Sequence, residues 1–333
     1  MATPAYNTIG AIAHQYIIDN IAYQFQDANY LSFHYFDEKK GLENSENGTF
    51  IQVPLMLGQG TNAQMTSGDA TAVLNLNVQD NAQNAVFDFK FYNNALVLTL
   101  EELAKAGQGE NSVLDIARVK ADDVMEQTVN FFASAIYGSG TDAGGKAFNG
   151  LSDALGISGV SYGSLTDTNA GYARWLSERD TASATANYQA VGLMISRINA
   201  KSRRKSDKLD LMVSNHAVRS QFEQSQQGQQ NYYNKTQLEA GFDGDFITVN
   251  GCRWYTDEFS PGTANGIAAD NHLYFLCTNT LKFYRRFGFG VKSPMDTNQL
   301  LPTQPIKISV DHVVGNFVCN KRNSNGIMTA IVA

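Results

Sequence analysis

The chain has 333 residues, of which 43% are hydrophobic and 17% are charged, a composition typical of a folded globular protein rather than a disordered one. Its formal net charge is -7, but residues 1–200 carry 10 basic and 21 acidic side chains (net -11), whereas residues 201–333 carry 15 and 11 (net +4). This balance disfavours tight nucleic-acid binding, which needs a basic surface. The uneven charge suits either ordinary solubility or contact between neighbouring copies of the chain.

The cysteines and the N-terminal segment indicate which cellular compartment is expected for the protein. Cys252, Cys277 and Cys319 are too far apart for a C-x-x-C site, so we expect reduced thiols, as in a cytosolic protein. The first residues lack a basic segment followed by an apolar run, which predicts that there is no signal peptide. No apolar stretch approaches the ~20 residues that cross a bilayer, so we expect no membrane partner.

The N-terminal part is predicted to form an amphipathic helix. Residues 9–25 place apolar side chains, among them Ile12, Tyr16 and Phe25, near helical spacing. This segment contains no Lys or Arg, whereas a helix on a membrane surface usually carries basic residues on its polar face. We expect the apolar stripe to dock on protein, either on its own chain or on a neighbouring copy.

The next part of the chain has an apolar/polar alternation of period two, which predicts half-buried antiparallel strands at 50–57, 70–78 and 85–92. Pro54 is typical of an edge strand because it lacks an N–H donor. The polar segment between the first two strands contains Met65, and no Lys or Arg occurs between Lys40 and Lys90. The pattern therefore predicts a long, neutral-to-acidic hairpin arm.

Three phenylalanines recur at alternate positions in the third strand candidate. The pattern predicts that Phe87, Phe89 and Phe91 share one face of a strand. They form an apolar anchor either for a neighbouring copy or for the chain's own body.

Two further helices are predicted between residue 95 and Gly138. Residues 95–106 favour a short helix ended by Gly107. Residues 112–137 favour a much longer helix, with Val113, Ala117, Ala121, Val124, Thr128, Phe131 and Ala135 along one face. Leu114, Met125, Phe132 and Ile136 flank this face. Ser112 with Asp115 resembles a capping box, and Gly138 is a natural C-cap. At ~1.5 Å per residue the long helix would measure ~39 Å.

The remainder mixes helices and strands without a βαβ rhythm, which predicts an α+β protein that is elongated in its N-terminal third. Helices are expected at 185–201 and 215–226. Strands are expected at 208–214, within 246–259 around a turn at Asn250-Gly251, at 271–278 and at 280–291. Strands are also expected within 305–333, with turns at Gly315-Asn316 and near Asn325-Gly326.

One motif raises the possibility of a nucleotide-binding enzyme. Gly140, Gly145 and Lys146 have the G-x-x-x-x-G-K spacing of a phosphate-binding loop. However, a long helix precedes the loop instead of a strand, position 147 is alanine instead of a magnesium-binding Ser or Thr, and a poor helix start follows. We interpret the segment as a glycine-rich connection.

Other sequence patterns for metal-binding or catalytic sites are weak. None of the five histidines lies at i+3 or i+4 from another, as a helical metal site requires. The carboxylates Asp122 and Asp123 point to different sides of a helix, and there is no G-x-S-x-G motif. We expect no catalytic residue, no metal and no cofactor.

The segment 201–208 is the one basic cluster and includes Arg203 and Arg204. Its cations offset the macrodipole at the end of a predicted helix. Contact with an acidic surface of a neighbouring subunit is the alternative, and contact with nucleic acid comes third.

The order of these features resembles the major capsid protein of tailed double-stranded DNA phages, which has the Hong Kong 97-type fold. The stretch FNGLSDAL (148–155) followed by SYGSLTDTNAGYARW (161–175) is similar to the segment after the spine helix in one branch of that family. FDGDFITVNGCRWYTDEFSPG (242–262) resembles the family's F-x-G-x-P-V-x-x-D strand pair, although Arg253 stands where proline is common and Trp254 where an aliphatic residue is common.

The resemblance implies a division of the chain into parts. It implies an N-terminal arm at 1–48, an extended hairpin loop at 49–94, a peripheral domain at 95–149 with the spine helix at 112–137, an axial domain at 150–290, and closing strands of the peripheral domain at 291–333.

The resemblance also implies a structural function. Copies would form hexamers and pentamers of an icosahedral shell in the virion, assembled in the host cytoplasm around double-stranded DNA bound without sequence specificity. Portal and scaffolding proteins are expected partners, since no separate assembly domain leads the sequence. Candidate contacts between subunits are Ile12, Tyr16, Phe25, Met65, Phe87, Phe89, Phe91, Arg203 and Arg204. An encapsulin-like compartment shell is the alternative within the same fold. The loop tip lacks the lysine that some members use in a Lys–Asn cross-link, so we expect no such bond.

Overall fold

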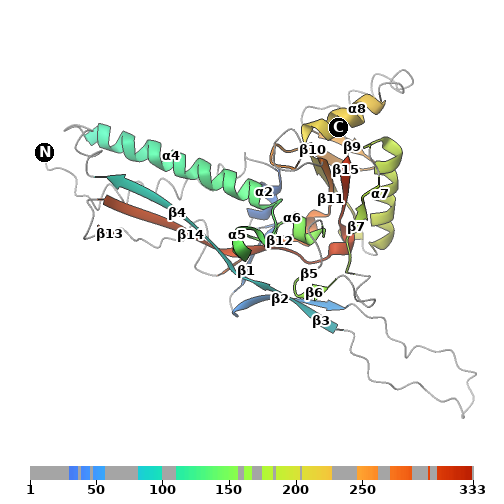
Figure 1. Ribbon diagram of the computed structural model, residues 1–333, viewed down its shortest axis with the longest axis horizontal. Helices are drawn as coiled ribbons and strands as arrows, with labels where there is room; N and C mark the ends of the chain where they lie inside the picture. The colour runs from blue at the N-terminus through green and yellow to red at the C-terminus, as the bar shows by residue number, and fades with distance from the viewer. Residues whose placement is uncertain are drawn as a thin grey trace, which may run out of the picture.

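The structure is a computed structural model with two main β-sheets, helices packed against them, and a two-stranded hairpin, β2–β3, at their junction (Figure 1). It describes residues 30–36, 39–45, 48–56, 82–99, 110–156, 161–166, 175–182, 185–202, 205–226, 246–261, 271–286, 299–300 and 306–331.

The described helices are α2 (Tyr30–Phe36), α4 (Glu110–Ala135), α5 (Asp142–Gly145), α6 (Leu151–Ala154), α7 (Tyr188–Lys201) and α8 (His216–Gln226), with 3₁₀ turns η2 (Lys205–Asp207), η5 (Thr278–Thr280) and η6 (Arg322–Ser324). The described strands are β1 (Leu42–Ser45), β2 (Phe50–Met56), β3 (Ala82–Asp88), β4 (Lys90–Thr99), β5 (Ser161–Tyr162), β6 (Leu165–Thr166), β7 (Glu178–Asp180), β8 (Leu211–Ser214), β9 (Phe246–Val249), β10 (Cys252–Thr256), β11 (Asn271–Leu276), β12 (Leu281–Arg286), β13 (Gln299–Leu300), β14 (Ile306–Cys319) and β15 (Gly326–Ile331).

The six-stranded sheet, in the order β7-β15-β11-β8-β10-β9, is buried on both faces. In β11, Leu273 and Phe275 belong to a core cluster with residues of α7 and α8. Tyr274 and Leu276 alternate with them and belong to the larger cluster on the other face. Because side chains alternate along a strand, the apolar half of this strand, Leu273 to Leu276, contributes to two cores at once. Figure 1 shows α7 and α8 beside this sheet.

The five-stranded sheet is longer and narrower. Its path is β1-β12-β14-β13, and β4 pairs with β14 along its whole length, from Ile306↔Thr99 to Gly315↔Lys90. The helix predicted at 95–106 is therefore wrong for residues 95–99, which continue β4. The apolar run ALVLT is compatible with either structure, and long-range pairing with β14 decides in favour of the strand.

The long helix α4 lies along this sheet (Figure 1) and confirms the helix predicted at 112–137 within two residues at each end. Its buried face in the described part carries Val124, Thr128, Phe132 and Ile136. The predicted face included Phe131, which is instead 40% exposed. Val124 and Thr128 of the predicted face and the flanking Phe132 and Ile136 are buried, whereas Phe131 lies at the margin of the contact and stacks on Tyr92 at 4.4 Å.

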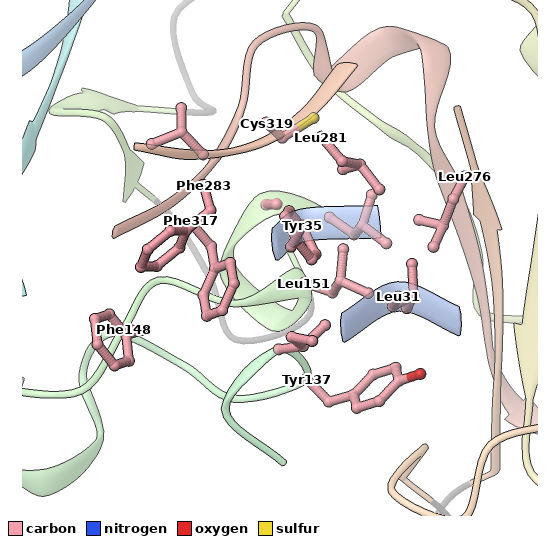
Figure 2. Packing of buried hydrophobic residues seen from close by; sticks show 14 of the residues in the cluster. Leu31, Tyr35, Tyr137, Phe148, Leu151, Leu276, Leu281, Phe283, Phe317 and Cys319 are labelled. Atoms are coloured by element: carbon pink, nitrogen blue, oxygen red, sulfur yellow. The ribbon is translucent and has the colours of Figure 1, made fainter. Parts of the chain in front are cut away.

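The larger core joins the two sheets where α2 inserts between them (Figure 2). Tyr35 of α2 meets Phe317 of β14 edge-on, with ring centroids 4.8 Å apart. Phe283 of β12 lies 4.9 Å from Phe317. Phe148, from the segment after α5, completes the group at 5.7 Å from Phe317. Aromatic contacts of this kind add to the stability gained from burial alone.

The C-terminal strands differ from the sequence prediction. β14 runs straight through Gly315 and Asn316, so the turn predicted there is wrong. A side chain at Gly315 would lie 2.6 Å from both the Phe283 ring and the Tyr284 carbonyl oxygen, so the glycine serves close packing instead of a turn. β15 then joins the six-stranded sheet between β7 and β11 instead of the five-stranded one. The segment 291–333 thus contributes strands to both sheets.

The short-range predictions in the second half are confirmed. α7 and α8 begin and end within three residues of the predicted 185–201 and 215–226. β9 and β10 pair through the expected two-residue turn, in which Asn250 and Gly251 have φ of 49° and 85°. Positive φ at both positions is the signature of the hairpin turn that Asn-Gly favours.

Candidate assembly site

The glycine-rich loop after α4 is occupied by the chain's own carboxylates. The Gly140 N–H donates to Asp153 at 2.6 Å, and the Ser139 N–H donates to Asp142 at 3.1 Å. A phosphate would have to displace these two negative charges from the amides that a phosphate-binding loop offers. The structural context of a nucleotide site is thus missing, in agreement with the sequence interpretation.

The same loop is a tight joint between α4 and the rest of the molecule. Leu151 N–H donates to the Ile136 carbonyl at 2.7 Å, which folds the chain back on the end of the helix. A Cβ at Gly150 would lie 2.5–2.7 Å from three backbone oxygens, of Gly138, Ile136 and Ala135. Gly138 does not have positive φ and would place a Cβ 3.3 Å from its nearest atom. The critical glycine of the joint is therefore Gly150 instead of the predicted C-cap Gly138.

The hairpin β2–β3 confirms the base of the predicted arm. Its strands pair antiparallel from Phe50↔Asp88 to Met56↔Ala82, and Pro54 lies in a two-stranded sheet where both strands are edges. The strand predicted at 70–78 lies outside the described residues.

The β5–β6 turn holds the base of the arm against the body. The Val86 N–H donates to the Gly163 carbonyl at 3.0 Å, and the Phe87 ring lies 4.8 Å from Tyr162. Gly163 has a φ of 62°, and a Cβ there would lie 2.7 Å from Ala85. A left-handed glycine thus allows the arm to approach this closely.

A buried amide connects the arm, β14 and the glycine-rich loop. Asn316 is 0% exposed and donates from Nδ2 to the Asp88 carbonyl at 2.8 Å and to Asn149 Oδ1 at 2.9 Å. Its Oδ1 accepts from the Asn149 N–H at 2.9 Å. Lys90 Nζ also donates to the Gly145 carbonyl. Because a buried amide without partners is costly, this network fixes where the arm leaves the body.

The strand β4 leaves one face open. Tyr92 and Asn94 point to α4, where both hydrogen-bond to Thr128 Oγ1, at 3.1 and 2.8 Å. The alternate residues Phe91 and Val97 are 67% and 36% exposed. Val119 and Phe131 of α4 are also 67% and 40% exposed. Phe91 and Val97 therefore lie on the face of β4 that α4 does not cover, whereas Val119 and Phe131 belong to the helix on the other face, where the Phe131 ring stacks on Tyr92 at 4.4 Å.

The three phenylalanines proposed as an anchor have different environments. Phe87 is 3% exposed and belongs to the chain's own core, so it offers no surface in this structure. Phe89 lies between β3 and β4 and packs partly buried against the same core. Phe91 alone is open to solvent. The single strand predicted at 85–92 is wrong, because the chain changes sheet at residue 89. The candidates Ile12, Tyr16, Phe25, Met65, Arg203 and Arg204 lie outside the described residues.

The described part of the basic cluster is engaged within the chain. Lys201 forms an ion pair with Glu178, which connects α7 to β7. Asp207 pairs with Lys321 at 2.5 Å. Exposed pairs of this kind contribute little stability. The first pair engages a cation of the cluster, whereas the second joins the cluster's own Asp207 to a lysine from outside it.

Within the described residues, no group of three or more His, Cys, Asp or Glu side chains has an arrangement suited to a metal ion. The described helices include none that is long and apolar enough to cross a membrane. The three cysteines are buried, and burial raises the pKa of the thiols of Cys252 and Cys319 to about 11 and of Cys277 to about 12. These thiols are poor nucleophiles near neutral pH because they stay protonated.

One buried carboxyl group joins the end of α4 to the six-stranded sheet. Tyr137 donates from its hydroxyl to Asp257 at 2.5 Å, and the Phe259 N–H donates to the other oxygen at 3.0 Å. Burial raises the pKa of the Asp257 carboxyl, although both hydrogen bonds lower it in part. Sequence reasoning missed this pair, since the two residues are 120 positions apart.

Comparison with known proteins gives a clear answer for the fold only. No protein-family model and no curated protein matches the chain. Among solved structures, the capsid of cyanophage A-1(L) is similar with a TM-score of 0.63 and 12% identity, over 90% of this chain and 96% of that one.

Two further structures are similar along most of the chain. The capsid of Myoviridae phage XM1 has a TM-score of 0.58 and 10% identity, covering 91% of this chain and 92% of that one. The SrpI encapsulin of Synechococcus elongatus PCC 7942 has a TM-score of 0.51 and 8% identity, covering 88% and 85%. The predicted Hong Kong 97-type fold is therefore confirmed: the chain has the fold of tailed-phage capsid proteins.

Proposed function

We propose that the chain is the major capsid protein of a tailed double-stranded DNA phage, a structural and non-enzymatic subunit. Its copies form hexamers and pentamers that close an icosahedral shell. The observation that carries this proposal is the similarity to the cyanophage A-1(L) capsid over 90% of this chain and 96% of that one. Because the similarity extends over most of both chains, it is not limited to one shared module.

The exposed surfaces of the subunit support self-association. Phe91 and Val97 lie on the open face of β4, and Val119 and Phe131 on the nearby helix α4. Exposed apolar side chains on the open face of β4 favour contact with another protein there. The unpaired edges of the β2–β3 arm are a liability in a monomer and a resource in an assembly, because a second chain can cover them.

The other partners follow from the shell role. Packaged DNA fills the shell without sequence-specific contact, since the net charge of -7 disfavours tight nucleic-acid binding. Portal and scaffolding proteins complete the assembly, which takes place in the host cytoplasm and ends in the virion. The predicted division into arm, loop, peripheral domain and axial domain belongs to this proposal.

A second candidate is the shell of an encapsulin-like compartment. The similarity to the SrpI encapsulin, at a TM-score of 0.51 over 88% of the chain, favours it. The two candidates differ in content, since a phage head fills with DNA and a compartment encloses protein. Nuclease-resistant DNA in particles from infected cells distinguishes the first from the second.

Electron microscopy of the purified chain, with and without a co-expressed scaffold, tests the proposal. We expect icosahedral particles or capsomer rings. Phe91→Ser is expected to reduce assembly, because it removes the most exposed apolar side chain of the open face. Lys146→Ala is the matched control, since Lys146 is exposed in the glycine-rich loop and makes no contribution to the open face.

Two outcomes contradict the proposal. Uniform monomers of the parent protein at high concentration, with scaffold present, argue against a shell subunit. Stoichiometric ATP binding that Lys146→Ala abolishes supports a nucleotide-dependent enzyme instead.

A shell built from this chain is expected to lack a Lys–Asn cross-link from the arm. The segment 57–81 contains no lysine. Mature particles should therefore dissociate into single chains on a denaturing gel, and a covalent ladder would contradict this expectation.

A further inference from the structure

The turn between β9 and β10 exposes a chemically labile pair of residues. Asn250 and Gly251 form the two-residue turn between Val249 and Cys252, which pair with each other. Both turn residues are exposed, and nothing lies within 4 Å of an ideal Cβ at Gly251. An asparagine followed by glycine is prone to cyclise, because no side chain shields the next main-chain nitrogen, and asparagine is among the thermolabile residues.

The neighbouring helix α7 contributes a hydrogen-bond donor at the reacting group. The Tyr188 hydroxyl donates to Asn250 Oδ1 at 3.2 Å. That oxygen gains negative charge when a nucleophile adds to the side-chain carbonyl carbon, so a donor placed there stabilises the developing charge. The absence of a side chain at Gly192 leaves space beside Asn250 Nδ2, since a Cβ there would lie 3.4 Å away.

Two other Asn-Gly pairs of the described chain provide an internal contrast. Asn325 is 0% exposed, and its Nδ2 donates to Thr280 Oγ1 and to the Lys321 carbonyl, both at 2.9 Å. Asn149 Oδ1 accepts from Asn316, and Gly150 packs against three carbonyl oxygens. Neither amide can turn toward the following nitrogen without local opening of the fold.

We infer that Asn250 is a site of spontaneous deamidation, promoted by the Tyr188 hydroxyl. The main-chain nitrogen of Gly251 attacks the side-chain carbonyl carbon of Asn250 and gives up its proton. The bond from that carbon to the side-chain nitrogen breaks, and the nitrogen leaves with this proton as ammonia. One water molecule then opens the cyclic imide at either carbonyl and yields aspartate or isoaspartate.

The modification changes both charge and geometry at the turn. Each converted chain gains one negative charge beside α7. Isoaspartate also adds one methylene to the main chain between positions 250 and 251, and a two-residue turn with both φ positive has no room for it. The register Cys252↔Val249 is therefore expected to loosen in the isoaspartyl form.

Peptide mapping by mass spectrometry tests the inference on the full chain. The protein is incubated in mildly alkaline buffer, sampled over days, and digested, and isoaspartate is quantified by enzymatic methylation. We expect the peptide with Asn250 to convert about tenfold or more faster than those with Asn149 and Asn325. In denaturant, where the fold no longer protects any amide, the three rates should converge.

Two variants separate the parts of the inference. Asn250→Gln should abolish the fast conversion and leave the other peptides unchanged. Tyr188→Phe, which keeps the exposed ring and removes the hydroxyl, should slow conversion at Asn250 about two- to tenfold. An unchanged rate in Tyr188→Phe would remove the hydroxyl from the mechanism. Equal rates of the three peptides in the native protein would overturn the site itself.

Discussion

The six-stranded and five-stranded sheets differ in how many of their faces the chain itself covers. The first has apolar cores on both faces, and β11 contributes six buried residues in succession. The second is covered by α4 on one face and leaves Phe91, 67% exposed, on the other. Exposed large apolar residues of the described chain also occur around the first sheet: Tyr188 and Leu193 on α7, and Tyr30, which stacks on Tyr255 of β10.

The difference indicates which part of the subunit is complete by itself. A sheet with both faces covered by its own chain needs no partner to satisfy its hydrophobic surface. The part formed by β4, β14 and α4 has apolar side chains on an open face, and both strands of the hairpin β2–β3 are edges. In the proposed shell, another chain covers both features. We interpret the six-stranded part as the stable base and the elongated part as the surface of assembly.

The largest expected effect is the loss of a core side chain from the closed region. Trp254 is 0% exposed, and its ring centroid lies 5.0 Å from that of the tilted Phe222 ring. Its indole nitrogen donates to Ser214 Oγ at 2.8 Å. Trp254→Ala should lower the free energy of unfolding of the unassembled subunit by about 3–5 kcal/mol. Denaturant titration measures the free energy of unfolding. A decrease of under about 1 kcal/mol would contradict the view that the six-stranded part is closed and tightly packed.

The joint between the regions is expected to be nearly as sensitive. Gly150→Ala places a methyl group 2.5–2.7 Å from three carbonyl oxygens and should cost about 2–3 kcal/mol. Gly138→Ala is the matched control, because its nearest contact is 3.3 Å and the backbone there does not have positive φ. Thermal unfolding of the two variants should show the larger drop for Gly150→Ala, and the reverse order would refute the assignment.

The Asp257–Tyr137 pair should make the contact between α4 and the six-stranded sheet sensitive to pH. Because burial raises the pKa of Asp257 above its unfolded value, the folded state binds the proton more tightly. This contribution to stability is fully present below the unfolded pKa and is lost as pH rises through the folded pKa. In Asp257→Asn the fall in unfolding free energy between acid and neutral pH should be smaller than in the parent protein. Parallel curves of unfolding free energy against pH for parent and variant would contradict a contribution of Asp257 to the pH dependence.

The smallest expected effect on the isolated subunit is at the open face. Phe91→Ser should change the unfolding free energy of the unassembled chain by no more than about 0.5 kcal/mol, because the side chain is mostly solvated. The same variant should impair assembly. A large destabilisation of the subunit would mean that Phe91 packs on its own chain and would blur the distinction between the regions.

Local signals predicted the elements whose structure depends on nearby residues. The periodicity of 112–137 predicted α4 within two residues, and Asn250-Gly251 predicted the β9–β10 turn. The predictions failed where distant contacts decide. Residues 95–99 form a strand because β14 pairs with them, and Gly315 packs under Phe283 instead of turning the chain.

The candidate site was predictable in outline but not in detail. Alternation in the sequence pointed to Phe87, Phe89 and Phe91 together, whereas the switch of sheets at residue 89 leaves only Phe91 open. The sequence pattern predicts a turn at Asn316, whereas its buried amide connects the hairpin β2–β3 to β14. Such roles depend on residues more than 160 positions away and leave no local pattern.

A near-atomic structure of the assembled particle tests the central claim most directly. We predict that the open face of β4 is covered by a neighbouring copy, with Phe91 buried at the contact, while the six-stranded sheet keeps the same cores as in the single chain. A particle in which Phe91 stays exposed to solvent, with contacts formed elsewhere, would contradict the claim that the elongated part is the surface of assembly.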